Sequence, residues 1–413
     1  MKQKLAIDQW VFIFYGMQLF MAPLSIAGSS IAAALFLISY AGSGFWKNWR
    51  TVLERPWFWP VLAILALNLA GLLWTDDLAH GRYILGKLWY FLFPLLGATL
   101  PWNRQRLRLL VLLFLTGLGL NALVGALQWF GLYPWHPMVP DDGPVGYSYH
   151  VYLGLLLTAA LLWILYDLKH QIVLRRPWAL LLGGIFFLQL IMSPGRTGQL
   201  AFLLLFPAAL LVLAVGRWRT WALSVALLGA LVLGLSPVVQ QRFMAGVSDL
   251  IHYHQGNVVT SLGVRLVLWE GALEMAAEHP ILGVGTGGYR AEILRLQEEG
   301  AIPRTPGLSE HVIEPHNSYL AYLAEFGIVG LMILLWFLYA LGRESWLARN
   351  TPEGWLRLSL LSTFLIGSLF DAFIWIWCIM IPLAVVSGVP SRRPARTPEG
   401  VVETADLLAP AKP

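Results

Sequence analysis

Charged residues are scarce in this chain of 413 amino acids, at 12% of the sequence, while hydrophobic residues make up 58%. A soluble globular protein carries about a quarter charged residues. Together with a mean hydropathy of +0.66, this composition excludes a string of soluble domains and indicates a protein of the lipid bilayer. The 28 basic and 23 acidic residues give a formal net charge of +5. In a membrane protein these basic residues report sidedness rather than nucleic-acid binding.

Cysteine is almost absent. The single residue, Cys378, excludes an intrachain disulfide framework, a multi-cysteine zinc site and an iron–sulfur cluster. It lies in an apolar run, which predicts a buried, unreactive thiol. The motifs HExxH, GxSxG, GxxxxGK[ST] and Asp-x-Asp are also missing. The acidic pairs Asp76-Asp77 and Asp141-Asp142 have neighbouring side chains that point apart, so divalent-metal catalysis is not expected.

Long hydrophobic runs, in contrast, are abundant. A membrane-spanning helix needs roughly 20 mostly apolar residues. We therefore expect an all-α integral membrane protein with about 12 transmembrane helices. The first run begins near Gln9 and is longer than the apolar region of a signal peptide, so it should remain as a membrane helix. The expected helices centre near residues 17, 37, 66, 92, 120, 159, 185, 207, 229, 329, 363 and 381.

The polar connections between these runs alternate in basic charge. Cytoplasmic loops carry an excess of lysine and arginine. The connections on one side hold 20 basic residues and those on the other side hold eight, so we expect both termini to be cytoplasmic. Eight of the nine histidines share the outer side, which places any chemistry there, away from ATP. The eight outer cations are Arg82, Lys87, Arg196, Arg242, Arg265, Arg290, Arg295 and Arg304.

Tryptophan and tyrosine recur near the ends of the expected helices, as in Trp89-Tyr90. Such positions are typical of an aromatic belt at the lipid interface. Some outward-facing rings could instead stack on sugars or line a groove for a lipid tail. The sequence has neither an internal repeat nor a matched pair of Gly- or Pro-broken segments, the pattern of many secondary transporters.

One connection, residues 239–315, is long and amphipathic. Its pattern predicts a helix over 264–279 with Arg265 and Trp269 on one stripe, then a glycine-rich turn, then a second helical stretch that ends at Gly300. We expect a compact helical cap on the outer face, between the ninth and tenth transmembrane helices. The expected organisation is residues 1–238 with helices one to nine, 239–315 as the cap, 316–390 with helices ten to twelve, and 391–413 as a disordered cytoplasmic tail.

The glycine-rich turn, residues 283–288, matches GxGxxG. No strand precedes it and no acidic residue follows at the spacing of a dinucleotide site, so a nicotinamide site is not expected. Two interpretations stay open: a flexible turn between two cap helices, or a loop whose bare backbone approaches a phosphate or a sugar.

Four outer residues are candidates for chemistry. Arg196 lies in a short turn between two spans, where it either snorkels to the interface or binds an anion at the next helix N-terminus. Arg265 and Arg290 are either surface guanidiniums or phosphate ligands, since the planar fork forms paired hydrogen bonds with phosphate. His316, where the cap meets the next span, suits a general base near neutral pH. Such a set can displace a diphosphate, with guanidinium in place of a metal.

The order and sidedness of these motifs resemble the O-antigen ligase/polymerase superfamily of bacterial inner membranes, most closely its ligase branch. The motifs span about residues 193–330, and the hydropathy pattern covers nearly the whole chain. The matching elements are Gly195-Arg196-Thr197, Arg265-x-x-x-Trp269, Gly283-x-Gly285-x-Gly287 with Tyr289, and His316-Asn317-Ser318-Tyr319-Leu320.

The resemblance implies a GT-C-like membrane glycosyltransferase that uses an undecaprenyl-diphosphate-linked glycan. The ligase moves this O-antigen glycan onto a lipid A-core sugar at the periplasmic face of the Gram-negative inner membrane, which completes lipopolysaccharide. Inversion by direct displacement is expected, without cofactor, metal, nucleotide or nucleic acid.

The resemblance also implies roles for individual residues. His316 is the base that deprotonates the acceptor hydroxyl, and Arg196 and Arg265 bind the donor diphosphate. Lys87 resembles a cationic position of ligases, although a lysine that snorkels to the interface explains it equally well, and Arg290 is a further candidate for the diphosphate. The residues expected to support the site are Gly283, Gly285, Gly287, Tyr289, Asn317 and Tyr319.

Three alternatives stay open. An O-antigen polymerase would have two sizeable periplasmic loops, whereas the other outer connection here, about residues 134–150, is short. A protein O-oligosaccharyltransferase would be longer, with a soluble region after the last spans. A polytopic transporter would carry ionisable residues near the middle of its spans, for which Asp371 is the best candidate, although Asp371 is better placed in an outer turn.

Overall fold

A computed structural model describes residues 2–134, 143–214, 216, 218–305 and 314–391. These ranges are helical throughout and contain no strand, which confirms the expected all-α class. The elements are α1 (Lys2–Met21), α2 (Ile26–Ser43), η1 (Phe45–Asn48), α3 (Arg50–Leu53), α4 (Phe58–Ala70), η2 (Gly71–Leu73), α5 (Leu78–Lys87), η3 (Leu88–Phe91), α6 (Leu92–Gly97), α7 (Arg104–Trp129), α8 (His150–His170), α9 (Arg176–Met192), α10 (Arg196–Leu213), α11 (Trp218–Gly234), α12 (Pro237–His254), α13 (Ser261–Glu278), α14 (Tyr289–Glu298), α15 (Ser318–Leu347), α16 (Pro352–Gly367), η4 (Phe373–Trp375) and α17 (Trp377–Ser387).

Each of the expected span centres lies inside a helix, in α1, α2, α4, α6 to α11 and α15 to α17. Among the described residues, five helices are long and apolar enough to cross a bilayer: α2, α7, α8, α10 and α15. The number rises to seven if each of two bent pairs counts as one span. Others are apolar but short, such as α9 with 17 residues and α17 with 11. A multi-pass membrane protein is therefore confirmed, whereas twelve spans are not.

One of these five helices contains a break. The helix α15 is interrupted at Gly327, whose φ of 60° and ψ of −157° are not helical. The backbone N–H of Ile328 donates to the Pro280 carbonyl at 2.9 Å, so a segment of the cap fills the break. Non-helical backbone within a membrane-spanning helix is tolerated where the protein satisfies its hydrogen-bonding groups. The sequence shows no matched broken spans, and this break was not predicted because its partner lies far away in the chain.

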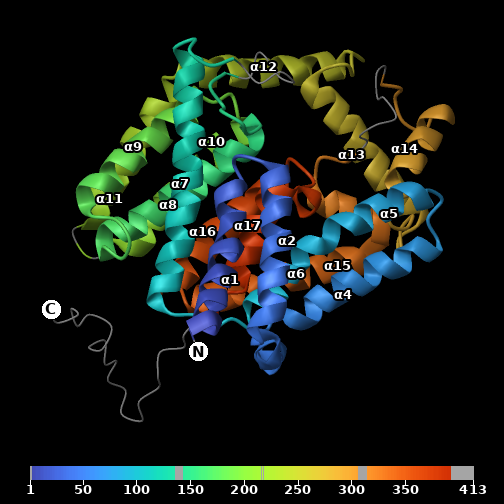
Figure 1. Ribbon diagram of the computed structural model, residues 1–413. Coiled ribbons are helices and arrows are strands. Elements are labelled where there is room, and N and C mark those ends of the chain that lie inside the picture. The colour runs from blue at the N-terminus through green and yellow to red at the C-terminus, as the bar shows by residue number, and fades with distance from the viewer. Residues whose placement is uncertain (1, 135–142, 215, 217, 306–313, 392–413) are drawn as a thin grey trace.

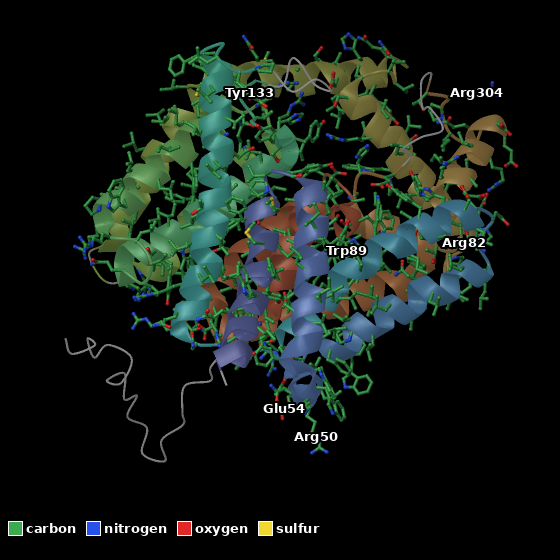
Figure 2. The ribbon with its side chains drawn as sticks, in the orientation of Figure 1. Arg50, Glu54, Arg82, Trp89, Tyr133 and Arg304 are labelled. Atoms are coloured by element: carbon green, nitrogen blue, oxygen red, sulfur yellow. The ribbon has the colours of Figure 1, made fainter. Side chains whose placement is uncertain are left out.

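The helices form a bundle with a helical cap at one end. In Figure 1, α1, α2 and α7 stand side by side, α12 lies across the top, and α13 and α14 descend along one flank. The helix α8 is the most enclosed candidate span, with 83% of its apolar window buried, and packs against α9, α10 and α16. We call the end that carries α12–α14 the cap end. Figure 2 places Arg50 and Glu54 at the opposite end.

The cap has a hydrophobic core of its own. The predicted helix 264–279 is α13, which ends before His279, and the second predicted helix is α14, followed by Gly300 in a left-handed conformation (φ 76°). A further helix, α12, precedes them and was not predicted. The buried core residues come from α13, α14, the loop that follows and α15: Val267, Leu268, Ala272, Met275, Tyr289, Ile293, Leu296, Ile302 and Ala324. Of the expected tail, residues 392–413 lie outside the described residues.

Candidate functional site

His316 lies immediately before α15, at the cap end of the bundle. Asn317 is the N-cap of α15, and its side-chain oxygen accepts hydrogen bonds from the N–H groups of Tyr319 at 2.9 Å and Leu320 at 3.1 Å. Such capping satisfies the free donors of a helix start. His316 has φ 46°, a left-handed conformation that is uncommon outside glycine. The sequence Pro315-His316-Asn317 therefore sets the imidazole at a fixed, strained corner, as predicted for a helix start.

The imidazole of His316 is paired with Asp371. The Nδ1 atom lies 3.0 Å from the Asp371 carboxylate oxygen Oδ1, and the side chains are 34% and 7% exposed. The same Oδ1 accepts the N–H of Ala372 at 2.9 Å, which fixes the carboxylate. A carboxylate accepts, so Nδ1–H is the donor and Nε2 retains the lone pair that can take a proton. Asp371 lies in the turn after α16, where the sequence placed it, and its pairing with His316 was not predicted.

The turn after α16 and the start of α15 are locked together. Asn317 and Ser318, at the start of α15, form hydrogen bonds to the turn after α16, and the Tyr319 hydroxyl donates to a carbonyl of the last turns of α16. These contacts place Asn317 and Tyr319 beside the pair, as expected of supporting residues. The hydrogen bonds are Ser318 N to Ser368 O (2.8 Å), Ser318 Oγ to Asp371 O (3.1 Å), Asn317 Nδ2 to Leu369 O (3.2 Å) and Tyr319 OH to Leu365 O (3.1 Å).

The cap reaches this site through α13. The indole Nε1 of Trp269 donates to the Pro315 carbonyl at 2.8 Å, one residue before His316. Arg265 lies one helical turn earlier on the same face, since residues four apart are neighbours on a helix surface. The face of α13 that carries Arg265 is therefore anchored, through Trp269, to the Pro315 carbonyl just before the candidate base.

Three arginines gather near the N-terminus of α10. Arg196 is the first residue of α10, and its Nη1 lies against Gly246 of α12, where an added Cβ would be 2.8 Å away. Arg242, Asp249 and Arg265 are within electrostatic range of Arg196. Within the described part of the chain, none of the three guanidinium groups forms a hydrogen bond or an ion pair. We call Arg196, Arg242 and Arg265 the arginine group. Three positive charges beside one aspartate and a helix N-terminus favour an anion.

The structure brings Arg196 and Arg265 together as predicted, and adds Arg242. Arg242 is one of the eight outer cations, so its sidedness was a signal in the sequence. Its helix, α12, was not predicted, and its position relative to Arg196 depends on the packing of α12 on α10.

Lys87 and Arg290 differ from the arginine group, because each faces a protein carboxylate. Lys87 Nζ lies 3.2 Å from Glu314 Oε1, with side chains only 19% and 11% exposed. Arg290 Nε lies 3.9 Å from Asp77 Oδ2. Burial lowers the pKa of His80 nearby, against the attraction of Asp77, and the charges of Arg290 and Lys87 lower it further. A diphosphate at these two cations would have to compete with the carboxylates.

The glycine turn is a packing element. Every backbone N–H from Gly283 to Gly288 donates a hydrogen bond to an acceptor in the protein. Among them, Gly285 N donates to Glu325 O at 2.8 Å and Gly287 N donates to Glu325 Oε1 at 3.0 Å. An added Cβ on Gly283 would meet the α15 backbone at 2.4 Å, and one on Gly287 would meet Gly81 N at 2.5 Å. The turn thus wedges between α15 and α5. In this structure the N–H groups of the turn are engaged by the protein, which favours a packing role over an approach to a phosphate.

Two buried side chains, those of Glu325 and Tyr289, lie next to the glycine turn. Glu325 is 1% exposed, and its role as the acceptor for the turn was missed because it lies 38 residues from Gly287. Tyr289, expected near the site, belongs to the cap core instead, where its hydroxyl donates to Leu268 O at 2.6 Å. Burial raises the pKa of Tyr289 well above its ordinary value.

Two outer features lie at the cap surface. Arg304 is exposed and donates to the Gln297 carbonyl at 3.2 Å (Figure 2). In the described ranges, one group of side chains could hold a metal ion: Glu278, His279 and Glu292. Arg295 forms ion pairs with Glu278 and Glu292, which already neutralises the two carboxylates.

Comparison with known proteins identifies a family model and relatives that match part of the chain. Residues 179–335 match a family model described as O-antigen ligase. This range runs from α9 into α15 and contains the arginine group, the glycine turn and His316, while Lys87 and Asp371 lie outside it. An O-antigen ligase of Escherichia coli (strain K12) is 26% identical over 168 residues, which is 40% of this chain and 38% of the relative.

An uncharacterized protein of Haemophilus influenzae is 29% identical over 121 residues, which is 27% of this chain and 30% of the relative. The matched segments thus span less than two fifths of these curated relatives. They confirm the resemblance predicted from the motifs: this multi-pass membrane protein is similar to the O-antigen ligase family over the segment that carries His316 and the arginine group.

Proposed function

We propose that this protein is an O-antigen ligase. It would transfer an O-antigen glycan from undecaprenyl diphosphate to a sugar of lipid A-core at the periplasmic face of the Gram-negative inner membrane, as a metal-independent inverting glycosyltransferase. The observation that carries the proposal is the paired imidazole of His316, together with an arginine group whose side chains have no protein partner in the described residues; His316 and the three arginines all lie in the segment that matches the family.

The base in this mechanism is Nε2 of His316. Asp371 holds Nδ1–H and stabilises the imidazolium that forms when Nε2 takes the proton of the acceptor hydroxyl. The hydroxyl oxygen attacks the anomeric carbon of the donor, and the bond from that carbon to the diphosphate oxygen breaks. Attack from the side opposite the leaving group inverts the anomeric centre.

The arginine group supplies the charge for the leaving diphosphate. Negative charge grows on the diphosphate as the glycosidic bond breaks, and guanidiniums already in place stabilise it without reorganisation. Arginine remains protonated and binds phosphate oxygens through two parallel hydrogen bonds. The N-terminus of α10 adds its unpaired N–H groups. Three arginines can therefore take the part that a divalent cation plays in other glycosyltransferases.

The site would face the periplasm, and both chain termini the cytoplasm. The uneven distribution of basic residues supports this orientation, since the cap end carries few lysines and arginines outside the candidate site.

Reconstitution of the purified protein tests the proposal. The protein is incorporated into liposomes with an undecaprenyl-diphosphate-linked glycan and rough lipopolysaccharide, in the presence of EDTA. We expect slower-migrating lipopolysaccharide that carries the glycan. Longer lipid-linked glycan with unmodified lipopolysaccharide would indicate a polymerase instead. Two intact lipids would contradict glycan transfer between them and favour a protein acceptor or transport.

A further inference from the structure

A cavity with an aromatic lining lies at the cap end of the bundle, near the start of α17. This half-open cavity of about 360 Å³ is lined by the turn between α1 and α2, the loop before α8 with the first turn of α8, and the start of α17. The α1–α2 turn lies at the cap end of both helices (Figure 1). The lining is rich in aromatic rings: Tyr147, Tyr149, Tyr152 and Trp377. We call this space the tyrosine cavity.

The tyrosine cavity shares residues with the surroundings of Asp371. Tyr152 packs edge-on against Phe373, two residues after Asp371, with ring centroids 5.9 Å apart. Asp371 lies within electrostatic range of both Tyr152 and Cys378, and both of these residues line the cavity. A molecule in the cavity would therefore lie within electrostatic range of the carboxylate that holds the candidate base.

Two polar atoms of the lining have no protein partner. Among the described residues, neither the Tyr152 hydroxyl nor the Trp377 indole N–H forms a hydrogen bond, and neither is among the fully enclosed unpaired atoms. Buried tyrosine and tryptophan side chains normally find a partner for these atoms. The neighbouring hydroxyls of Tyr147 and Tyr133 do pair with each other, at 3.0 Å. The two free groups are available to a ligand.

This combination of groups suits a sugar ring. Aromatic faces pack against the C–H faces of a pyranose, and the hydroxyl and indole N–H can bond to its hydroxyls. A few fixed polar groups in a mainly apolar pocket of roughly 300–1,000 Å³ are typical of small-molecule sites. A larger cavity of about 860 Å³ between α7, α9 and the α11–α12 junction has a mostly apolar lining that also includes Gln189 and Ser236.

We propose that the tyrosine cavity is a pyranose-binding subsite that holds a sugar adjacent to the bond being made and so sets glycan specificity. This inference rests on the proposed function. The sugar belongs either to the donor glycan or to the acceptor core, and both present the same chemistry to Tyr152 and Trp377. Tyr152 and Trp377 lie outside the family match, which covers residues 179–335, and outside the motifs that carry the resemblance.

Kinetics of the full-length protein in liposomes identify the source of the sugar. Tyr152→Phe removes one hydroxyl and retains the ring, and Trp377→Phe removes the indole N–H. Loss of one hydrogen bond should raise one KM about 3- to 10-fold, with kcat within about twofold. A raised donor KM assigns the donor sugar, and a raised acceptor KM assigns the core sugar. Tyr339→Phe on α15, where Tyr339 is 68% exposed, is the matched control.

A binding measurement separates this inference from the proposed function. Saturation-transfer difference NMR with methyl hexosides reports sugar contact on the detergent-solubilised protein, whether or not transfer occurs. We expect signals with the unmodified protein and with Tyr339→Phe, and their loss in both cavity variants at an unchanged melting temperature. Sugar contact without transfer would contradict the ligase and retain the subsite. Normal transfer with both KM values and the NMR signals unchanged in both variants would overturn the subsite and retain the ligase.

Discussion

His316 combines two features that are local in sequence with one that is not. Its strained φ of 46° and the Asn317 cap follow from neighbouring residues, and the sequence predicts both a helix start and a candidate base there. A backbone in a sparsely populated region costs of order 1–3 kcal/mol and persists where surrounding structure holds it. Asp371 supplies that hold from 55 residues away. Hydropathy places Asp371 in an outer turn, but its pairing depends on how α15 packs against α16.

Replacing His316 tests the base directly. His316→Ala should lower kcat at least ~100-fold, because a general base contributes typically 10²–10⁴-fold, while the KM for the donor stays within about twofold. Transfer is measured as glycan-bearing lipopolysaccharide in the reconstituted system. His254→Ala, at an exposed histidine at the end of α12, should leave the rate unchanged. A normal rate in a stably inserted His316→Ala variant would contradict the assignment.

Asp371 is a positioning residue in this scheme. Asp371→Asn retains the size of the side chain but removes the charge that stabilises imidazolium, so kcat should fall by roughly 10- to 1,000-fold with little change in either KM. Asp371→Glu should recover part of that loss. The split between kcat and KM is the deciding readout. Equal losses for the Asn and Glu variants, together with a lowered melting temperature, would show a merely structural role.

At the scale of elements, the glycine turn illustrates what sequence patterns leave open. The spacing of Gly283, Gly285 and Gly287 predicts a turn, and the structure has one. Its partners are the η2–α5 region and α15, and these lie far from it in the chain. Nothing in the local sequence distinguishes a turn that approaches a ligand from one that is wedged between two helices.

Two glycines of the cap provide a matched comparison. Gly287 and Gly300 both have positive φ, 72° and 76°, but a Cβ at Gly287 would meet Gly81 N at 2.5 Å while one at Gly300 would meet nothing within 4 Å. Both alanine variants carry the backbone strain, of about 1 kcal/mol, and Gly287→Ala adds a clash between backbones. We expect a clearly larger fall in melting temperature and in transfer for Gly287→Ala. Equal falls would contradict a wedged turn.

At the scale of the whole molecule, one buried charge cluster joins three parts of the chain at the end opposite the cap. Glu344 Oε1 of α15 lies 2.6 Å from Arg55 Nη2 and 3.1 Å from Arg357 Nη1 of α16. Both arginines also donate to the Val389 carbonyl at 3.2 Å, just after α17. Arg357 is fully buried. One carboxylate therefore balances two guanidiniums, which join the α3–α4 connection, α15 and α16 to one another and bond to the residues just after α17.

Removal of this carboxylate should destabilise the bundle. Glu344→Gln leaves two buried arginines without a counter-charge, and breaking a buried pair in this way costs about 3–5 kcal/mol. A lower melting temperature in detergent is the expected result. Glu274→Gln, at an exposed residue of α13 in the cap, should have no effect within about 0.5 kcal/mol. Equal melting temperatures for both variants would show that the cluster is not a structural anchor.

Hydropathy predicts where apolar helices lie because burial in lipid is a property of composition, and each expected centre lies in a helix. It does not predict where those helices break, since the break in α15 at Gly327 is held by a hydrogen bond from Ile328 to the distant Pro280 carbonyl. The orientation of the chain in the membrane can be predicted from the sequence in the same way as the apolar helices, because it follows from the distribution of lysine and arginine among the loops.

The orientation can be measured because the chain has one cysteine, and Cys378 is only 3% exposed. In a Cys378→Ser background, Glu298→Cys places a thiol on the exposed end of α14 in the cap, and Lys47→Cys places one in the exposed segment at the opposite end. A membrane-impermeant maleimide added to intact spheroplasts should label Glu298→Cys, and should label Lys47→Cys only after the membrane is permeabilised. The reverse result would place the His316–Asp371 pair on the cytoplasmic side. A ligase that meets its lipid-linked glycan at the periplasmic face would then be excluded, because the base and the arginine group lie at the cap end.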